Sequence, residues 1–152
     1  MHDLLRLNEC FLHVQRLKTR AQFQAVLAGA IIAKTVHFAL HRSRLEGVAA
    51  DDEAIEFNKA GAAVPLFFHR DMWIGAMVPK RWARRAATRN AIKRQIYAVS
   101  RELCSAFPPA AFVVRLRCGF AKIDFPSAVS DPLKQAVRAE IQVLMESGSK
   151  AA

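Results

Sequence analysis

Residues 72–107 restrict the fold more than any other segment of this chain. An apolar run at 72–78 is followed by Pro79, and the 30 residues from Met72 to Arg101 hold eight Lys or Arg and no Asp or Glu. A run that is hydrophobic on both faces is typical of a central strand covered by helices. We therefore expect a strand at 72–78, a basic loop at 80–87 and a helix at about 88–107, closed by Pro108 and Pro109.

The expected helix has two unlike faces. At roughly 100° per residue, a narrow apolar arc faces the core and consists of Ile92, Ile96, Val99 and Leu103. The adjoining arc has no carboxylate and consists of Arg89, Asn90, Lys93, Arg94, Tyr97 and Arg101. A solvated helix face usually pairs opposite charges at i,i+4, whereas Arg89 and Lys93 repel each other. This favours an anionic partner over a merely solvated face.

The composition agrees with a folded, cationic domain. The chain has 152 residues, with 23 Lys and Arg against 13 Asp and Glu, a formal charge of +10 and a pI near 10.3. A hydrophobic content of 53% is too high for a disordered basic tail. A cationic patch on a globular domain most often meets nucleic acid, so RNA or DNA is favoured over a membrane surface.

The remaining segments indicate one α+β domain. Thr19 and Gln22 form a capping box for a short helix that ends at Gly29. Alternating apolar residues predict strands at 36–41 and 112–118, and a final helix begins at Ser130 or Asp131 and ends near Gly148. The acidic, Ala-rich residues 45–65 read as a long mobile loop or insertion. The element order is αββαβα. We divide the chain into an N-terminal extension at 1–15, a single domain at 16–147 and a tail at 148–152.

Membrane and export signals are not expected. The longest apolar run covers residues 25–33, whereas a bilayer span needs roughly 20 residues. Charged residues interrupt the first 19 positions, so they do not resemble a secretion signal. The three cysteines, Cys10, Cys104 and Cys118, indicate neither a disulfide framework nor a zinc site. We expect a cytoplasmic protein with no membrane partner.

The basic segment carries a family resemblance. Ile74-Gly75-Ala76-Met77-Val78-Pro79-Lys80-Arg81, followed by Arg84-Arg85-Ala86 and Thr88-Arg89-Asn90-Ala91-Ile92-Lys93-Arg94, resembles the signature of the bacterial ribonuclease P protein subunit. Arg16-Leu17, Gln22-Phe23 and Val26 resemble its first helix, and Phe112-Val113-Val114 resembles its fourth strand. The similarity covers roughly residues 16–144. The sequence departs from the family pattern at Ala91, Tyr97, Ala98 and Ala111.

The resemblance implies a fold and a role. The fold is a small α/β sandwich of the ribosomal-S5-domain-2-like type, with a left-handed βαβ crossover. The basic loop and helix would bind the catalytic RNA subunit through Lys80, Arg81, Arg84, Arg85, Arg89, Asn90, Lys93, Arg94 and Arg101. A cleft between the first helix and the sheet would bind the single-stranded 5′ leader of precursor tRNA. The endonucleolytic chemistry would belong to the RNA and its Mg²⁺ ions.

Three residues are candidates for leader binding. Phe23, Phe38 and His41 lie where the resemblance places aromatic positions, and single-stranded RNA binding uses stacking surfaces beside cations. Each has a competing interpretation as a core residue, because an amphipathic helix and strand need buried side chains. Trp73 is expected in the core, while Trp82 would either stack on RNA or anchor the turn.

No catalytic or metal-binding residues are expected in the protein itself. Hydrolysis by protein groups would need clustered carboxylates or histidines. His37 and His41 are four apart on a strand, which is not a metal-ligand spacing, and Asp51, Asp52 and Glu53 are interpreted as solvated loop residues. Two other functions stay open at this point. One is a ribosomal or other structural RNA-binding protein of the same fold, and the other is a protein-only nuclease.

Overall fold

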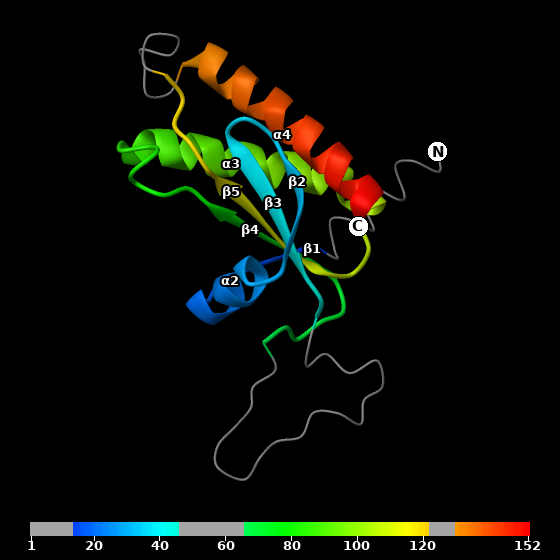
Figure 1. Ribbon diagram of the computed structural model, residues 1–152. Coiled ribbons are helices and arrows are strands. Elements are labelled where there is room, and N and C mark those ends of the chain that lie inside the picture. Colours follow the sequence, from blue (N-terminus) through cyan, green and yellow to red (C-terminus); the bar gives the residue numbers. More distant parts are fainter. Residues whose placement is uncertain (1–13, 46–65, 122–129) are drawn as a thin grey trace, which may run out of the picture.

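The computed structural model describes residues 14–45, 66–121 and 130–152 (Figure 1). The expected mobile loop at 45–65, apart from Leu45, and residues 1–13 of the expected extension lie outside the described residues.

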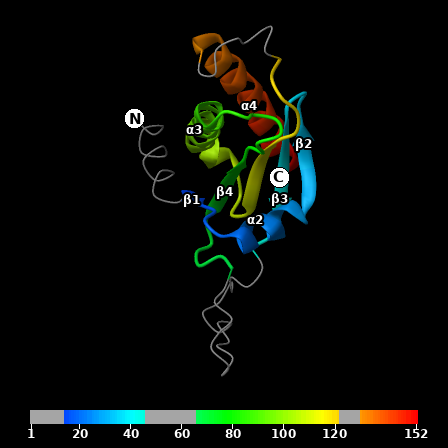
Figure 2. The same ribbon diagram turned by 90° about the vertical axis from the view of Figure 1, so that its left-hand side faces the viewer.

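A five-stranded mixed sheet forms the centre of the domain. Its strands are β1 (Val14–Arg16), β2 (Ala30–Lys34), β3 (Phe38–Ser43), β4 (Met72–Met77) and β5 (Ala111–Leu116), in the order β1-β4-β5-β3-β2. Strand β4 is parallel to both β1 and β5, whereas β3 is antiparallel to both β5 and β2. Helices α3 (Ala86–Leu103) and α4 (Asp131–Ala151) cover one face, and α2 (Arg20–Leu27) lies on the other (Figures 1 and 2).

The expected mixed α/β architecture is confirmed, but the expected element order lacked two strands. Strand β1 has only three residues, which is too short for a period-two pattern to be visible. Strand β2 lies in an apolar stretch without alternation, and a register shift between Ile31 and Ala33 interrupts its pairing with β3. Both are the outer strands of the sheet, where burial selects least strongly for alternation.

Helix α2 begins as its capping box predicts. The Thr19 hydroxyl accepts a hydrogen bond from the Gln22 amide at 3.2 Å, and Gln22 Oε1 accepts from the Thr19 amide at 3.1 Å. Gln22 Nε2 also donates to the carbonyl of Leu66 at 2.8 Å. The cap therefore fixes the start of α2 and ties it to the chain just before β4.

The sheet separates two hydrophobic cores. Phe112, Val114 and Leu116 of β5 point into the larger core beneath α3 and α4, while Val113 points into the smaller core beneath α2. Helix α3 contributes Ile92, Ile96 and Val99 to the larger core, as its apolar arc predicts, and Leu103 packs partly buried against it. Alternate side chains of β5 are thus buried in the two cores on opposite faces of the sheet.

Helix α4 extends further than expected. Ser130 caps it by accepting from the Leu133 amide at 3.2 Å, but the helix continues past Gly148 to Ala151. A Cβ at Gly148 would lie 2.3 Å from Leu40 Cδ2, so the glycine permits close packing of α4 on β3 and does not end the helix. The segment expected as a tail is largely helical.

Helix α4 also holds the turn between β2 and β3. Glu140 accepts from the Thr35 hydroxyl at 2.9 Å and from the His37 amide at 3.1 Å, and its Oε1 lies 2.7 Å from His37 Nδ1. The His37 ring stacks on Phe120, with centroids 4.0 Å apart. His37 therefore pins the hairpin to α4.

One cysteine, Cys104, forms a disulfide that the sequence did not indicate. Cys104 is buried and disulfide-bonded. Cys118 is a free thiol. The number and spacing of the cysteines therefore gave no indication of the disulfide at Cys104.

We predict that Gly29→Ala destabilises the fold. A Cβ at Gly29 would lie 2.1 Å from the backbone oxygen of Arg42, so α2 or β3 must shift. Such overpacking costs about 1–3 kcal/mol of unfolding free energy, measurable by urea denaturation. Ala28→Ser, at the exposed preceding residue, is the control and should change stability by less than about 0.5 kcal/mol. Equal stability of Gly29→Ala and wild type would contradict the close approach.

Candidate nucleic-acid interface

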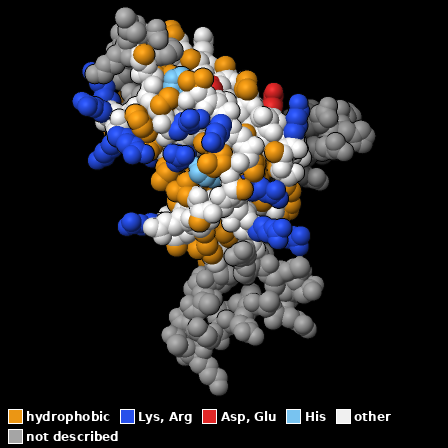
Figure 3. Space-filling model, in the orientation of Figure 1, with side chains coloured by type: hydrophobic (Ala, Val, Ile, Leu, Met, Phe, Trp, Pro, Cys, Tyr) orange, Lys and Arg blue, Asp and Glu red, His pale blue; other side chains and the backbone are white. Residues whose placement is uncertain are grey.

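The expected cationic residues follow one another along the loop after β4 and the outer side of α3. Lys80, Arg81, Arg84 and Arg85 are exposed in the loop, and Asn90, Arg94 and Arg101 are exposed on α3. Arg89 and Lys93 are half-buried on the same helix. On the face turned to the viewer in Figure 3, where β2 and β3 lie in front of α3, Lys and Arg side chains also outnumber acidic ones. The structure thus brings all nine residues together in one loop-and-helix unit.

The loop itself is tightly held. The amides of Trp82 and Ala83 both donate to the carbonyl of Pro79 at 3.1 Å, and Ala83 is buried in the larger core. A Cβ at Gly119 would lie 2.8 Å from the Trp82 oxygen, so the chain after β5 packs directly on the loop. Trp82 is 38% exposed, and the Arg81 guanidinium lies 5.3 Å from the centroid of its ring. Trp82 therefore anchors the turn and still presents part of its ring.

Arg89 has a structural role inside this unit. Its Nη1 donates to the carbonyls of Ala83 at 3.0 Å and Arg84 at 2.7 Å, which closes the loop onto the first turn of α3. Arg85, at the N-cap, provides no side-chain cap, and the first turn contains no acidic residue. The positive end of the helix dipole therefore adds to the charge of the loop.

One cation of this surface was missed by sequence reasoning. Arg16 of β1 is exposed, and its guanidinium lies 4.0 Å from the centroid of the Tyr97 ring on α3. The Tyr97 hydroxyl accepts from the Ala76 amide at 3.3 Å, just beyond the point where β1 ends. Tyr97, a departure from the family pattern, thus completes the edge of β4 and supports Arg16. Because strand β1 was not predicted, no pattern in the sequence indicated that Arg16 lies beside Tyr97.

The departure at Ala91 lies on the packed side of α3. Ala91 is only 7% exposed, whereas Asn90 beside it is exposed. Its small side chain therefore belongs to the packing surface of the helix.

The three candidate leader residues do not share one surface. Phe23 is half-buried on α2, and its ring packs on Gly75 of β4, where an added Cβ would lie 2.6 Å from Phe23 Cε1. His41 faces the same side of the sheet, since His41 and Gly75 both pair with Val113. Phe38 is 0% exposed in the larger core beneath α3 and α4. Phe38 and His41 are three residues apart on a strand and so point to opposite faces. Phe38 therefore has no exposed surface on which a base could stack.

His41 forms a buried polar contact on the α2 side of the sheet. It is 5% exposed, and its Nε2 accepts from Arg115 Nε at 3.1 Å. Because an arginine can only donate, the His41 proton resides on Nδ1, which has no hydrogen-bond partner among the described residues. Burial lowers the pKa of His41 from its ordinary 6.5, and the positive charges of Arg115 and Lys34 lower it further. His41 is therefore a neutral acceptor that orients Arg115.

The described residues contain neither a candidate metal site nor a candidate membrane span. In residues 14–45, 66–121 and 130–152, no three His, Cys, Asp or Glu side chains are grouped so that they could hold a metal ion. Within the same ranges, no helix is long and apolar enough to cross a membrane.

Comparison with known proteins identifies the family. A folded domain whose Lys and Arg residues follow one loop and one helix has the electrostatic footprint of the nucleic-acid-binding class of proteins. The family model Ribonuclease P matches residues 11–140. This chain therefore belongs to the Ribonuclease P protein family.

Curated relatives agree with this assignment. The ribonuclease P protein component of Burkholderia pseudomallei (strain 1106a) is 33% identical over 81 residues, 53% of this chain and 60% of that protein. That of Paraburkholderia xenovorans (strain LB400) is 34% identical over 77 residues, 51% of this chain and 55% of that protein. The similarity thus spans somewhat more than half the length of these relatives.

Solved structures show the same fold. The Staphylococcus aureus RNase P protein superposes with a TM-score of 0.55 at 18% identity, over 86% of this chain and 92% of that one. A mutant of the S. aureus protein with defective mRNA degradation activity gives the same TM-score at 17% identity, over 86% and 85% of the two chains. At this identity the likeness concerns the fold alone.

We predict that His41 makes stability fall with acidification. The pKa of His41 is lower in the folded state than its unfolded value of 6.5. At pH values between these two pKa values, the unfolded chain therefore binds more protons than the folded protein. The contribution of neutral His41 to the free energy of unfolding is complete above pH 6.5. It is lost as the pH falls toward the folded pKa, by at most about 1.4 kcal/mol per pH unit. Urea unfolding at a series of pH values from 7.5 to 5 measures this fall in the free energy of unfolding.

The control variants separate His41 from other groups. His41→Gln keeps an acceptor for Arg115 and should show a shallower fall, whereas His69→Gln, at an exposed position, should retain the wild-type fall. Identical pH profiles for wild type and His41→Gln would refute this assignment.

Proposed function

We propose that this chain is the protein subunit of ribonuclease P. In this role it binds the catalytic RNA subunit and the 5′ leader of precursor tRNA, and assists RNA-catalysed endonucleolytic removal of that leader. The single observation that carries the proposal is the acid-free loop-and-helix surface in a chain of the Ribonuclease P family. Phosphate contacts of this kind position a protein on RNA without reading sequence.

The cationic residues divide into contacting and positioning groups. Arg94 is exposed with no hydrogen bond or ion pair among the described residues, so it is suited to a phosphate. Arg101 is also exposed and donates from Nε to the backbone carbonyl of Tyr97 at 3.3 Å, a contact that does not neutralise its charge. Arg89 positions the loop that carries Arg84 and Arg85. Arg16 extends the surface onto β1 through its contact with Tyr97.

The proposed leader surface lies between α2 and the sheet. Phe23 supplies a partly exposed ring and Arg115 a cation oriented by His41. Stacking beside a positive charge is the usual way to bind unpaired nucleotides. Phe38 is not part of this surface.

The proposal assigns the chemistry to RNA. Mg²⁺ ions would be bound mainly by the RNA subunit and the substrate, not by a protein site, and would supply the hydrolytic chemistry there. Precursor tRNA is made in the bacterial cytoplasm, so a cytoplasmic location follows from the proposed role. The S5-domain-2-like type, with a left-handed connection from β4 through α3 to β5, belongs to the same proposal.

We predict that Lys93→Ala and Arg94→Ala weaken binding to a ribonuclease P RNA transcript without lowering the melting temperature. Each lost phosphate contact should reduce the slope of log K against log salt by roughly 0.7 to 0.9. Arg89→Ala should weaken binding and also lower the melting temperature, because its loop contacts are lost. Lys150→Ala, which removes an exposed charge from the last turn of α4, is the control.

A pull-down from cell lysate followed by RNA sequencing, together with a cleavage assay on the purified protein, tests the function as a whole. Recovery of ribosomal RNA in place of ribonuclease P RNA from lysate would favour the structural RNA-binding alternative. Cleavage of precursor tRNA by protein free of RNA would place the chemistry in the protein and overturn the proposal.

We predict that Phe23→Ala discriminates between substrate and product. Stacking on one base contributes roughly 1–3 kcal/mol, so precursor tRNA should bind the holoenzyme about 5- to 150-fold more weakly. Mature tRNA has no leader and should bind almost unchanged. Leu27→Ala is the matched control, because Leu27 packs in the same small core. Equal losses for precursor and mature tRNA, or the same discrimination by Leu27→Ala, would leave Phe23 as a core residue.

A further inference from the structure

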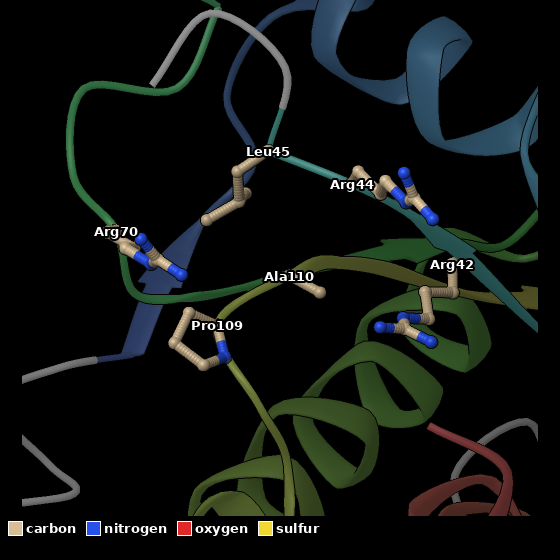
Figure 4. Close-up of a pocket in the computed structure, with 6 residues that line it drawn as sticks. All are labelled: Arg42, Arg44, Leu45, Arg70, Pro109 and Ala110. Carbon is tan, nitrogen blue, oxygen red and sulfur yellow. The ribbon is translucent and has the colours of Figure 1, made fainter. Parts of the chain in front are cut away.

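Three arginines line a pocket at the end of the sheet remote from the basic loop. The pocket has a volume of about 260 Å³ and is lined by Arg42, Arg44, Leu45, Arg70, Pro109 and Ala110 (Figure 4). Arg42 and Arg44 come from the end of β3, Arg70 precedes β4, and Ala110 precedes β5. These residues are far apart in the sequence, and only the parallel pairing of β4 with β5 and the antiparallel pairing of β3 bring them together.

The pocket is strongly cationic. None of its lining residues is acidic, and among the described residues the three guanidinium groups have neither an ion pair nor a hydrogen bond. The neighbouring Asp71 does not line the pocket, and it accepts from Gln15 Nε2 at 3.3 Å. Three positive charges around one pocket, with no acidic residue in its lining, favour the binding of an anion there.

One of the three arginines is also incompletely satisfied. Arg42 Nε is buried with no hydrogen-bond partner among the residues that the structure describes. Because buried N–H groups are almost always paired, such a group marks a position where an acceptor is missing. The planar fork of arginine suits phosphate oxygens, which accept two parallel hydrogen bonds.

The walls of the pocket are fixed by β4 and β5. The Trp73 amide donates to the carbonyl of Ala110 at 2.9 Å, and the Trp73 indole donates to the carbonyl of His69 at 2.9 Å. The backbone on both sides of Arg70 is therefore held before any ligand arrives. A volume of about 260 Å³ has room for a phosphate group with its ester oxygens.

We propose that this pocket is a second phosphate-binding site, which takes a backbone phosphate of RNA. It lies beyond one end of β4 while the basic loop follows the other end, and six residues of strand span about 20 Å. A long polyanion can contact both surfaces, whereas a small anion gains from only one. The inference rests on the proposed function, because it takes the phosphate to be one of the RNA backbone.

The test measures the salt dependence of binding to a ribonuclease P RNA transcript. Arg44→Gln and Arg70→Gln should each lower the slope of log K against log salt by roughly 0.7 to 0.9. Both side chains are exposed, so the melting temperature should stay at the wild-type value. Adding Arg94→Ala should lower the slope further by the same amount, since the two surfaces are separate. Arg138→Gln is the matched control, because its charge is already paired with Glu102 at 2.6 Å.

The outcomes separate the two proposals. If wild type and Arg94→Ala bind the transcript equally weakly at low salt, the proposed function fails. If Arg94→Ala lowers the slope while Arg44→Gln and Arg70→Gln match Arg138→Gln, the second site is refuted and the proposed function stands. A titration with inorganic phosphate, followed by NMR of the arginine Nε signals, tests whether the pocket binds a free anion in place of an RNA phosphate. Saturation of the pocket by inorganic phosphate with unchanged RNA slopes would assign it to a free anion and overturn the RNA site.

Discussion

Strand β4 is buried on both faces, and it positions each of the RNA-binding surfaces proposed for the described residues. Ile74 points into the larger core and Trp73 into the smaller one, while Gly75 provides the flat backbone on which Phe23 lies. The strand leads at one end into the basic loop and begins at the other beside Arg70. Apolar burial on both sides fixes its position, so the cations at its two ends are held despite their mutual repulsion.

The arginines of this protein fall into two groups by their contacts. Arg89, Arg115, Arg138 and Arg16 each contact a carbonyl, a histidine, a carboxylate or an aromatic ring within the fold. Arg94, Arg44 and Arg70 have no such contact among the described residues. A count of positive charges in the sequence does not separate these groups, because the first is defined by residues that are distant along the chain.

The parts of the fold that were predictable are those encoded by neighbouring residues. The capping box of α2, the apolar arc of α3 and the alternation of β5 are local patterns, and the structure contains all three. Strands β1 and β2 were not predicted because they are short or irregular and owe their form to pairing with distant strands. The position of Phe38 could have been read from its separation from His41, whereas the contact of Arg16 with Tyr97 and the three-arginine pocket required the sheet order.

The anchoring of Leu45 and Leu66 has a consequence for how this family can vary. Both residues pack against the smaller core, and Gln22 holds the carbonyl of Leu66. The two points where the chain leaves and rejoins the sheet are therefore fixed by contacts that do not involve residues 46–65. Loop-closure entropy grows only slowly with length, by about 0.6 kcal/mol per doubling. The domain can accordingly accept segments of very different length and composition at this point of the chain, at little thermodynamic cost.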